Sequence, residues 1–305
     1  MMPFVAIQEL DKFIGVITAL LTPFTSNGEN IDFQAVRDLV DWQVEQGIHC
    51  LFPAGTSGEG MLLSLEERRK LLEVVYDQAG GRIPVIAHAG DITTKGTVEL
   101  ALHAAGLQVD AVSVLTPYYY KVGEKEIADH FIKVANSIPK MPVILYNNPA
   151  TAGNELTLAV FKKVKEQCQN VVGIKDSSKS ITVLKGYKDS LTPGEPLLVG
   201  GDGIFKDALE IGAVGAISTI SNIFPKAMIK IFRAWSLGNK AELISAQEHV
   251  KDLLAILTKV PYYAACKIVL TKLGISGGSV RPPMGSLTVN QEKAVLASLK
   301  ELNVL

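Results

Sequence analysis

The 305-residue sequence lacks an excess of charge of either sign. It contains 30 Lys and Arg against 31 Asp and Glu, a formal net charge of −1 at pH 7. Binding to the phosphate backbone of a nucleic acid requires a basic surplus, so no nucleic-acid partner is expected. No apolar run reaches the ~18–20 residues that span a bilayer, and no membrane partner is expected either. With 48% hydrophobic residues, the chain can fold around a sizeable core.

Cysteine is scarce as well. Cys50, Cys168 and Cys266 are too few and too widely spaced for a disulfide framework or a zinc site, and we expect them to be reduced and buried. The five histidines form no metal-ligand spacing, so neither a metal nor a cofactor is expected. Residues 1–13 lack the long apolar core and the cleavage pattern of a signal peptide, which makes the cytoplasm the expected compartment.

Eight short apolar runs alternate with segments of helical periodicity. They cover residues 15–21, 47–55, 84–90, 111–117, 142–149, 171–176, 196–202 and 212–219. Runs this short suit strands buried on both faces, and the alternation favours a parallel sheet closed into a (β/α)8 TIM barrel of the α/β class. An open doubly wound sheet is the alternative. It is disfavoured because no G-x-G-x-x-G follows the first run, and polar or glycine-rich residues follow nearly every strand.

From about residue 224 onward the pattern is helical only. We expect these segments to supply the eighth barrel helix and then a C-terminal helical appendix. The predicted division is a catalytic barrel over residues 1–236 and a helical region over residues 237–305. Arg281-Pro-Pro interrupts the helices before the last one, because proline removes a donor and restricts the residue before it.

Two polar side chains end predicted strands. Lys175 ends the run VVGIK, which places its amine at the mouth of the predicted barrel. Partial desolvation there lowers the pKa of a lysine, and its neutral form is a nucleophile suited to Schiff-base chemistry. A lysine paired with Asp176 at a solvated strand end is the alternative, and strand position alone leaves both open. Tyr146 ends the run VILY, where a phenol suits proton transfer, while an ordinary buried tyrosine is the alternative.

Two loops after strands carry hydroxyl groups. Thr56 and Ser57 stand between glycines, where hydroxyls and backbone N–H groups can form a small anion cradle, with a plain turn as the alternative. The loop is not a nucleophile elbow, because Glu59 stands where G-x-S-x-G needs its last glycine. Tyr118-Tyr119-Tyr120 follows the fourth strand. Consecutive residues cannot share one face, so at least one ring should point toward a partner subunit or a neighbouring site.

These motifs, in this order, resemble the dihydrodipicolinate synthase and N-acetylneuraminate lyase family of class I pyruvate aldolases. The resemblance covers nearly the whole chain, from GVITALLTPF through GTSGE, LTPYYY, YNNP and GIKDSS to the late RPP element. It implies a metal-independent lyase in which pyruvate or another 2-oxo acid forms a Schiff base with Lys175 and then reacts with, or releases, an aldehyde.

The resemblance also implies roles for five further residues. Thr56, Tyr119 and Tyr146 would form a hydrogen-bonded proton relay, and Thr56 and Ser57 would hold the substrate carboxylate. The backbone of Ile217 would line the site. Because the family tyrosine that matches Tyr119 often crosses a dimer contact, a homodimer or a homotetramer is implied.

Two positions depart from the best-known branches of that family. Thr151 stands where the synthase branch has an arginine that grips the carboxylate of the semialdehyde, and one hydroxyl cannot replace this fork of donors. Asp202-Gly203 stands where the sialic-acid branch has an Asp-Glu pair. The expected substrate is therefore a 2-keto-3-deoxy sugar acid or a similar 2-oxo acid, with its hydroxyls held by Thr151, Asp202 and Ser218.

Other functions stay open at this point. Dihydrodipicolinate synthase itself, or a dehydratase or deaminase of the same family, would use the same imine. A non-catalytic barrel would need no lysine at a strand end. A metal-dependent aldolase or a phosphate-binding barrel would show ligands at strand ends or a glycine-rich cradle, for which residues 200–203 are a candidate.

Overall fold

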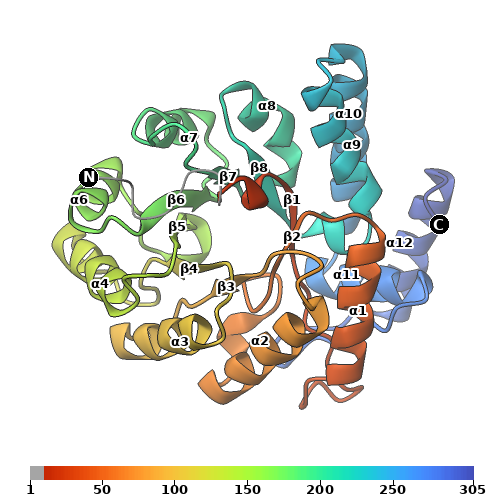
Figure 1. Ribbon diagram of the computed structural model, residues 1–305. Coiled ribbons are helices and arrows are strands. Elements are labelled where there is room, and N and C mark those ends of the chain that lie inside the picture. The colour runs from red at the N-terminus through yellow and green to blue at the C-terminus, as the bar shows by residue number, and fades with distance from the viewer. Residues whose placement is uncertain (1–9) are drawn as a thin grey trace.

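The computed structural model describes residues 10–305, and its centre is a sheet of eight parallel strands (Figure 1). The strands are β1 (Gly15–Ala19), β2 (Cys50–Phe52), β3 (Ile86–His88), β4 (Ala111–Leu115), β5 (Val143–Asn147), β6 (Val171–Asp176), β7 (Leu197–Val199) and β8 (Gly215–Ser218). Each of the eight apolar runs of the sequence contains one of them, as predicted.

The sheet closes on itself. Its strand order is β2-β1-β8-β7-β6-β5-β4-β3, and the two end strands meet where Leu51 and Val85 form a parallel bridge. There the backbone N–H of Leu51 donates to the carbonyl of Pro84 at 3.0 Å. The predicted TIM barrel is therefore confirmed.

Helices surround the barrel (Figure 1). Those between and after the strands are α1 (Phe33–Glu45), α2 (Leu65–Ala79), α3 (Thr94–Gly106), α4 (Glu124–Ser137), the short α5 (Pro149–Ala152), α6 (Leu158–Gln167), α7 (Ile181–Lys188), α8 (Phe205–Glu210) and α9 (Pro225–Ser236). Three more complete the chain: α10 (Lys240–Leu257), which packs on α9, α11 (Tyr262–Lys272) and α12 (Val289–Glu301).

Short 3-10 turns lie near strand ends. They are η2 (Asp11–Phe13), η3 (Gly60–Leu62), η4 (Asp202–Ile204) and η5 (Ile220–Asn222). Local sequence fixes many helix starts. At α2, for example, the Ser64 hydroxyl accepts the N–H of Glu67 while the Glu67 carboxylate accepts the N–H of Ser64, a complete capping box.

Two layers of apolar side chains explain why the strands read as continuous hydrophobic runs. One layer fills the barrel interior and includes Phe13, Ile17, Phe52 and Ile144. The other lies between the strands and the surrounding helices. Because each strand contributes to both layers, it is buried on both faces. The three cysteines are buried and unpaired, as expected.

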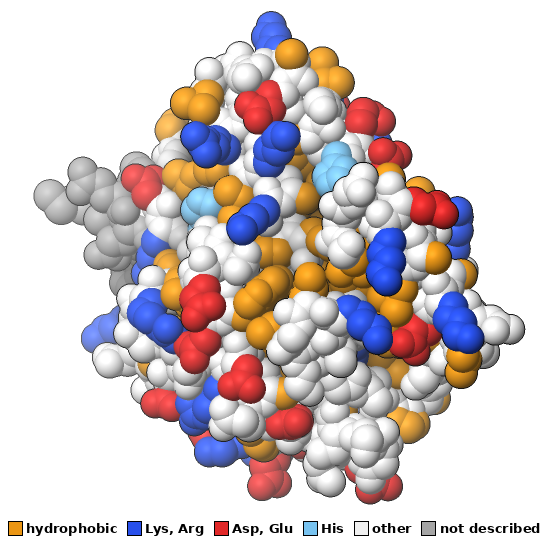
Figure 2. Space-filling model, turned by 90° about the vertical axis from the view of Figure 1, so that its right-hand side faces the viewer, with side chains coloured by type: hydrophobic (Ala, Val, Ile, Leu, Met, Phe, Trp, Pro, Cys, Tyr) orange, Lys and Arg blue, Asp and Glu red, His pale blue; other side chains and the backbone are white. Residues whose placement is uncertain are grey.

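Charges of both signs are interspersed with hydrophobic side chains over the face shown in Figure 2, in keeping with the balanced composition. Within residues 10–305, no single helix is long and apolar enough to cross a membrane. Helices α10 and α11 pass that test only when they are taken together, and they meet at an angle of 108°.

Candidate active site

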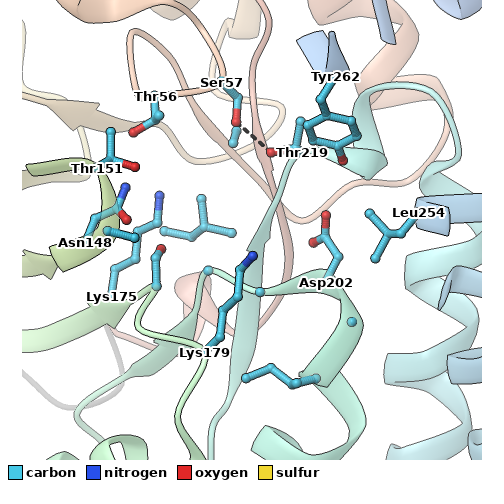
Figure 3. A pocket seen from close by; sticks show the side chains of 18 of the residues that line it. Thr56, Ser57, Asn148, Thr151, Lys175, Lys179, Asp202, Thr219, Leu254 and Tyr262 are labelled. Carbon is cyan, nitrogen blue, oxygen red and sulfur yellow. Dashed lines mark hydrogen bonds between the residues drawn. The ribbon is translucent and has the colours of Figure 1, made fainter. Parts of the chain in front are cut away.

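A cavity of about 470 Å³ lies at the carboxyl ends of the strands (Figure 3). Its walls come from the segments after β2, β5, β6, β7 and β8 and from α10 and α11. This end of a TIM barrel is where the fold places active sites. Seven of the predicted site residues line the cavity, namely Thr56, Ser57, Tyr146, Thr151, Lys175, Asp202 and Ile217.

Lys175 lies at the inner wall of the cavity with only 4% of its surface exposed. Its Nζ is 4.0 Å from the centroid of the Tyr146 ring and 4.2 Å from that of Phe52. Burial lowers the pKa of Lys175, while Tyr146 and Asp202 oppose that change. At a given pH, a larger fraction of Lys175 is therefore in the neutral, nucleophilic form than of a solvated lysine.

Asp176 does not neutralise this lysine. Its carboxylate accepts hydrogen bonds from the Asn147 amide at 2.7 Å and from the Ser178 hydroxyl at 2.6 Å, and it does not line the cavity. Neighbouring residues on a strand point to opposite faces, so Lys175 projects inward while Asp176 projects outward. The solvated Lys175–Asp176 pair that the sequence left open is absent.

Tyr146 reaches the same space from the adjacent strand, because the β5–β6 register pairs it with Lys175. Its hydroxyl lies 3.4 Å from the Thr56 hydroxyl and accepts the Asn148 amide at 3.2 Å. Burial alone would raise the pKa of Tyr146, but the positive charge of Lys175 and hydrogen bonds, that of Thr56 among them, outweigh it and lower the pKa. Such a phenol is suited to giving and receiving protons.

A buried imidazole completes this wall. The His88 ring lies 5.9 Å from the Tyr146 ring and 5.6 Å from the Phe52 ring, with its Nδ1 2.9 Å from the carbonyl of Ala54. Burial and the positive charges of Arg68 and Lys175 hold the pKa of His88 well below its usual value. A neutral His88 therefore adds no charge beside the amine.

The loop with Thr56 and Ser57 is held from two sides. The Ser57 hydroxyl lies 2.6 Å from the Thr219 hydroxyl, which joins the loop to the segment after β8. Glu59 adopts a left-handed backbone with φ of +55°. Gly60 follows because any Cβ there would lie 1.9 Å from the carbonyl oxygen of Ala54. The loop is thus a fixed structure rather than a plain turn.

Glu59 has a role that the sequence did not reveal. Its buried carboxylate accepts a hydrogen bond from Lys267 on α11 at 2.6 Å and another from the backbone N–H of Arg281 at 2.8 Å. Lys267 also donates to the carbonyls of Thr22 and Ser279. Burial lowers the pKa of Lys267 to about 8. The ion pair ties the Thr56–Ser57 loop to the C-terminal helices.

Asp202 forms part of the opposite wall (Figure 3). Its Oδ2 accepts the backbone N–H of Ile220 at 3.2 Å, whereas its buried Oδ1 has no hydrogen-bond partner within residues 10–305. Burial raises the pKa of Asp202, and hydrogen bonds oppose the change. Because the Asp202 carboxylate lines the cavity, it is suited to accept a hydroxyl donor from a substrate.

Ser218 and Tyr119 lie outside the cavity. Ser218 is fully buried, accepts the backbone N–H of Ser221 at 3.1 Å, and affects the site only by opposing the rise in the pKa of Asp202. Tyr119 is 79% exposed, and its ring packs on that of Tyr120. Of the three relay residues implied by the resemblance, the structure brings Thr56 and Tyr146 together and leaves Tyr119 on the surface of the single chain.

Several lining residues were not anticipated from the sequence. They are Asn148, Ser177, Lys179, Thr219, Leu254, Thr258, Tyr262 and Tyr263. Asn148 and Thr219 lie near the carboxyl ends of predicted strand runs and were detectable by the same criterion as Tyr146. Leu254 and Tyr262 lie on helices, for which strand ends give no signal. No group of three His, Cys, Asp or Glu among residues 10–305 is placed to hold a metal ion.

Comparison by sequence and comparison by structure both find proteins related to dihydrodipicolinate synthase. Residues 12–302 match the dihydrodipicolinate synthetase family. The 4-hydroxy-tetrahydrodipicolinate synthase of Methanopyrus kandleri is 33% identical, over 95% of this chain and 97% of that protein. A catalytic-lysine mutant of Ruminococcus gnavus sialic acid aldolase is a similar structure, 29% identical with a TM-score of 0.92, and the match covers 97% of this chain and 99% of that one. Escherichia coli YagE in complex with pyruvate is also 29% identical, with a TM-score of 0.91, and the match covers 96% of this chain and 99% of that one.

Proposed function

This chain belongs to the dihydrodipicolinate synthetase family of Schiff-base lyases, and on that basis we propose that Lys175 forms an imine with pyruvate or another 2-oxo acid. The observation that carries the proposal is the buried amine of Lys175 beside the Tyr146 ring at the inner wall of the cavity. A catalytic lysine in the Ruminococcus gnavus relative and pyruvate bound to YagE support the same chemistry. No metal takes part in the proposed reaction.

The reaction begins with attack of the neutral Lys175 amine on the C2 carbonyl of the 2-oxo acid. The carbinolamine that results loses water and leaves a protonated imine, which draws electrons from the adjacent carbon. In the cleavage direction the C3–C4 bond breaks, its electrons form an enamine, and the proton of the C4 hydroxyl is released as that oxygen becomes an aldehyde. Tyr146 takes and returns this proton, and Thr56 orients its hydroxyl.

The carboxylate of the 2-oxo acid rests on the Thr56–Ser57 loop. Both side chains line the cavity, and the contact with Thr219 fixes the Ser57 hydroxyl. Hydroxyl and backbone donors hold an anion here without a competing cation that would perturb the amine of Lys175. Ile217 closes the same end of the cavity from β8.

We propose a 2-keto-3-deoxy sugar acid, or a similar 2-oxo acid, as the substrate. Thr151 lines the cavity but offers one hydroxyl where the synthase branch has an arginine. Asp202 lines the cavity with a carboxylate that can accept a substrate hydroxyl. Ser218 does not line the cavity and acts only on the pKa of Asp202, whose rise on burial it opposes.

A second candidate is 4-hydroxy-tetrahydrodipicolinate synthase, because relatives such as that of Methanopyrus kandleri carry this name. A substrate panel separates the two. Pyruvate is held fixed with aspartate semialdehyde, glyceraldehyde, glyoxylate or N-acetylmannosamine, and cleavage of 2-keto-3-deoxy sugar acids is followed in parallel. Turnover of the sugar acids is expected. Efficient condensation with aspartate semialdehyde, and none with hydroxylated partners, would establish the synthase instead.

We also propose that the chain forms a homodimer or a homotetramer in which Tyr119 completes the site of a neighbouring subunit. The support is the exposure of Tyr119 together with its left-handed backbone, φ +75°, which holds the ring away from its own cavity. Sedimentation analysis tests this. A monomer with full activity would contradict it.

A further inference from the structure

The cavity contains a second lysine whose charge has no partner. Lys179 lies in the loop between β6 and α7, and Figure 3 shows its side chain reaching toward the space between Lys175 and Asp202. Among residues 10–305 its amine makes no hydrogen bond and no ion pair. An unpaired ammonium in a cavity wall is available to an anionic ligand.

The backbone around Lys179 holds the side chain in this position. Its φ is +61°, a left-handed conformation that residues other than glycine seldom adopt. The hydroxyl of Ser178, one residue before it, is fixed on Asp176, and the N–H of Ser180 donates to the same hydroxyl at 3.2 Å. Gly201 borders the stem of Lys179, where an added Cβ would lie 3.5 Å from the lysine Cγ. The loop therefore presents the amine to the cavity.

The other two charged side chains in the cavity, Lys175 and Asp202, are not available to bind a second anionic group. Lys175, Lys179 and Asp202 are the charged side chains among the described residues that line it. Once Lys175 is joined to the 2-oxo acid, whose carboxylate rests on Thr56 and Ser57, the ammonium of Lys179 is left for a second anionic group. The Asp202 carboxylate lines the same cavity, and a carboxylate accepts hydrogen bonds rather than binding anions.

We propose that Lys179 is a specificity-determining residue that binds an anionic group at the far end of the substrate, while Asp202 accepts a hydroxyl nearer the reacting carbon. The substrate is then a 2-oxo acid with a second acidic group, a carboxylate or a phosphate, at its other end. This inference rests on the proposed function, because the far end is defined only when the 2-oxo end is bound to Lys175. Lys179 thus supplies the positive charge that Thr151 does not.

Matched pairs of aldehydes test the proposal, with pyruvate fixed. Succinic semialdehyde is compared with butanal, and glyceraldehyde 3-phosphate with glyceraldehyde. The acidic member of at least one pair should have a KM lower by about two- to fivefold, the size expected of an exposed ion pair. The pair that shows the difference tells a carboxylate site from a phosphate site.

Variants show whether Lys179 is responsible. Lys179→Met should abolish the preference for the acidic aldehyde through KM with little change in kcat, and Lys179→Arg should keep it. Lys162→Met is the control, because Lys162 is exposed on α6 and does not line the cavity, yet its removal changes the net charge equally. A preference that survives in Lys179→Met, or falls equally in Lys162→Met, overturns the assignment.

Borohydride trapping of pyruvate separates failure of this inference from failure of the proposed function. If wild type forms the adduct at Lys175 but shows no preference for acidic aldehydes, the role of Lys179 is wrong and the proposed function stands. If no adduct forms, the proposed function itself is wrong. Turnover of aspartate semialdehyde that depends on Lys179 would support the anionic subsite while contradicting the sugar-acid substrate.

Discussion

At the scale of single residues, the chemistry depends on two side chains brought together by strand register. Tyr146 and Lys175 are paired across β5 and β6, so the amine and the phenol cannot separate without disruption of the barrel. Each alters the other: the charge of Lys175 lowers the pKa of Tyr146, and Tyr146 opposes the lowering of the pKa of Lys175 by burial. Two groups whose pKa values depend on each other in this way are suited to the successive proton transfers of imine formation.

Replacement of Tyr146 by phenylalanine should lower kcat by about 10²- to 10⁴-fold, the usual contribution of a general acid–base group. Pyruvate binding should change far less, because the carboxylate rests on the Thr56–Ser57 loop. Steady-state kinetics of the Tyr146→Phe variant give both quantities. A variant with near-normal kcat would remove Tyr146 from the mechanism.

The pH dependence of imine formation provides an independent check on the same pair. In wild type the rate should rise with pH and level off below 10.5, because burial lowers the pKa of Lys175 from that value. Tyr146→Phe removes a group that raises the pKa of Lys175, so the inflection should move to lower pH. Stopped-flow measurement with pyruvate follows it. An inflection that stays in place would mean that the two groups are not coupled.

At the scale of structural elements, the Thr56–Ser57 loop depends on a helix from the far end of the chain. Glu59, which ends the loop, forms its buried ion pair with Lys267 on α11, and both side chains are at most 1% exposed. This contact could not be predicted from the sequence, because 208 residues separate the two charges and neither stands in a recognisable pattern. Lys175 and Tyr146 were predictable, since each ends a buried strand.

Lys267→Met should lower the free energy of unfolding by about 3–5 kcal/mol, because it leaves the carboxylate of Glu59 buried without its partner. The double variant Glu59→Gln, Lys267→Met should lose less than the sum of the two single variants, since neither charge then remains unpaired. Urea denaturation of the three variants measures this coupling. Additive losses would show that the pair contributes no interaction of its own.

At the scale of the whole molecule, the barrel follows from the sequence and the shape of the cavity does not. Eight runs buried on both faces, each followed by a helical segment, permit few arrangements besides a closed parallel sheet. The pattern of α10 and α11 shows which side chains are apolar, but not that Leu254 and Tyr262 pack over the barrel mouth. Such contacts depend on how helices that are distant in the sequence pack together, which the spacing of apolar residues does not indicate.

The central claim is that this barrel positions one lysine for imine formation. The most direct test is incubation with pyruvate and borohydride, followed by peptide mass spectrometry. One reduced pyruvate per chain is expected, attached to Lys175, and no adduct is expected in Lys175→Met. Lys179 and Lys267 are the informative competitors, because one shares the cavity and the other has a pKa lowered to about 8. An adduct on either of them, or none at all, would contradict the account.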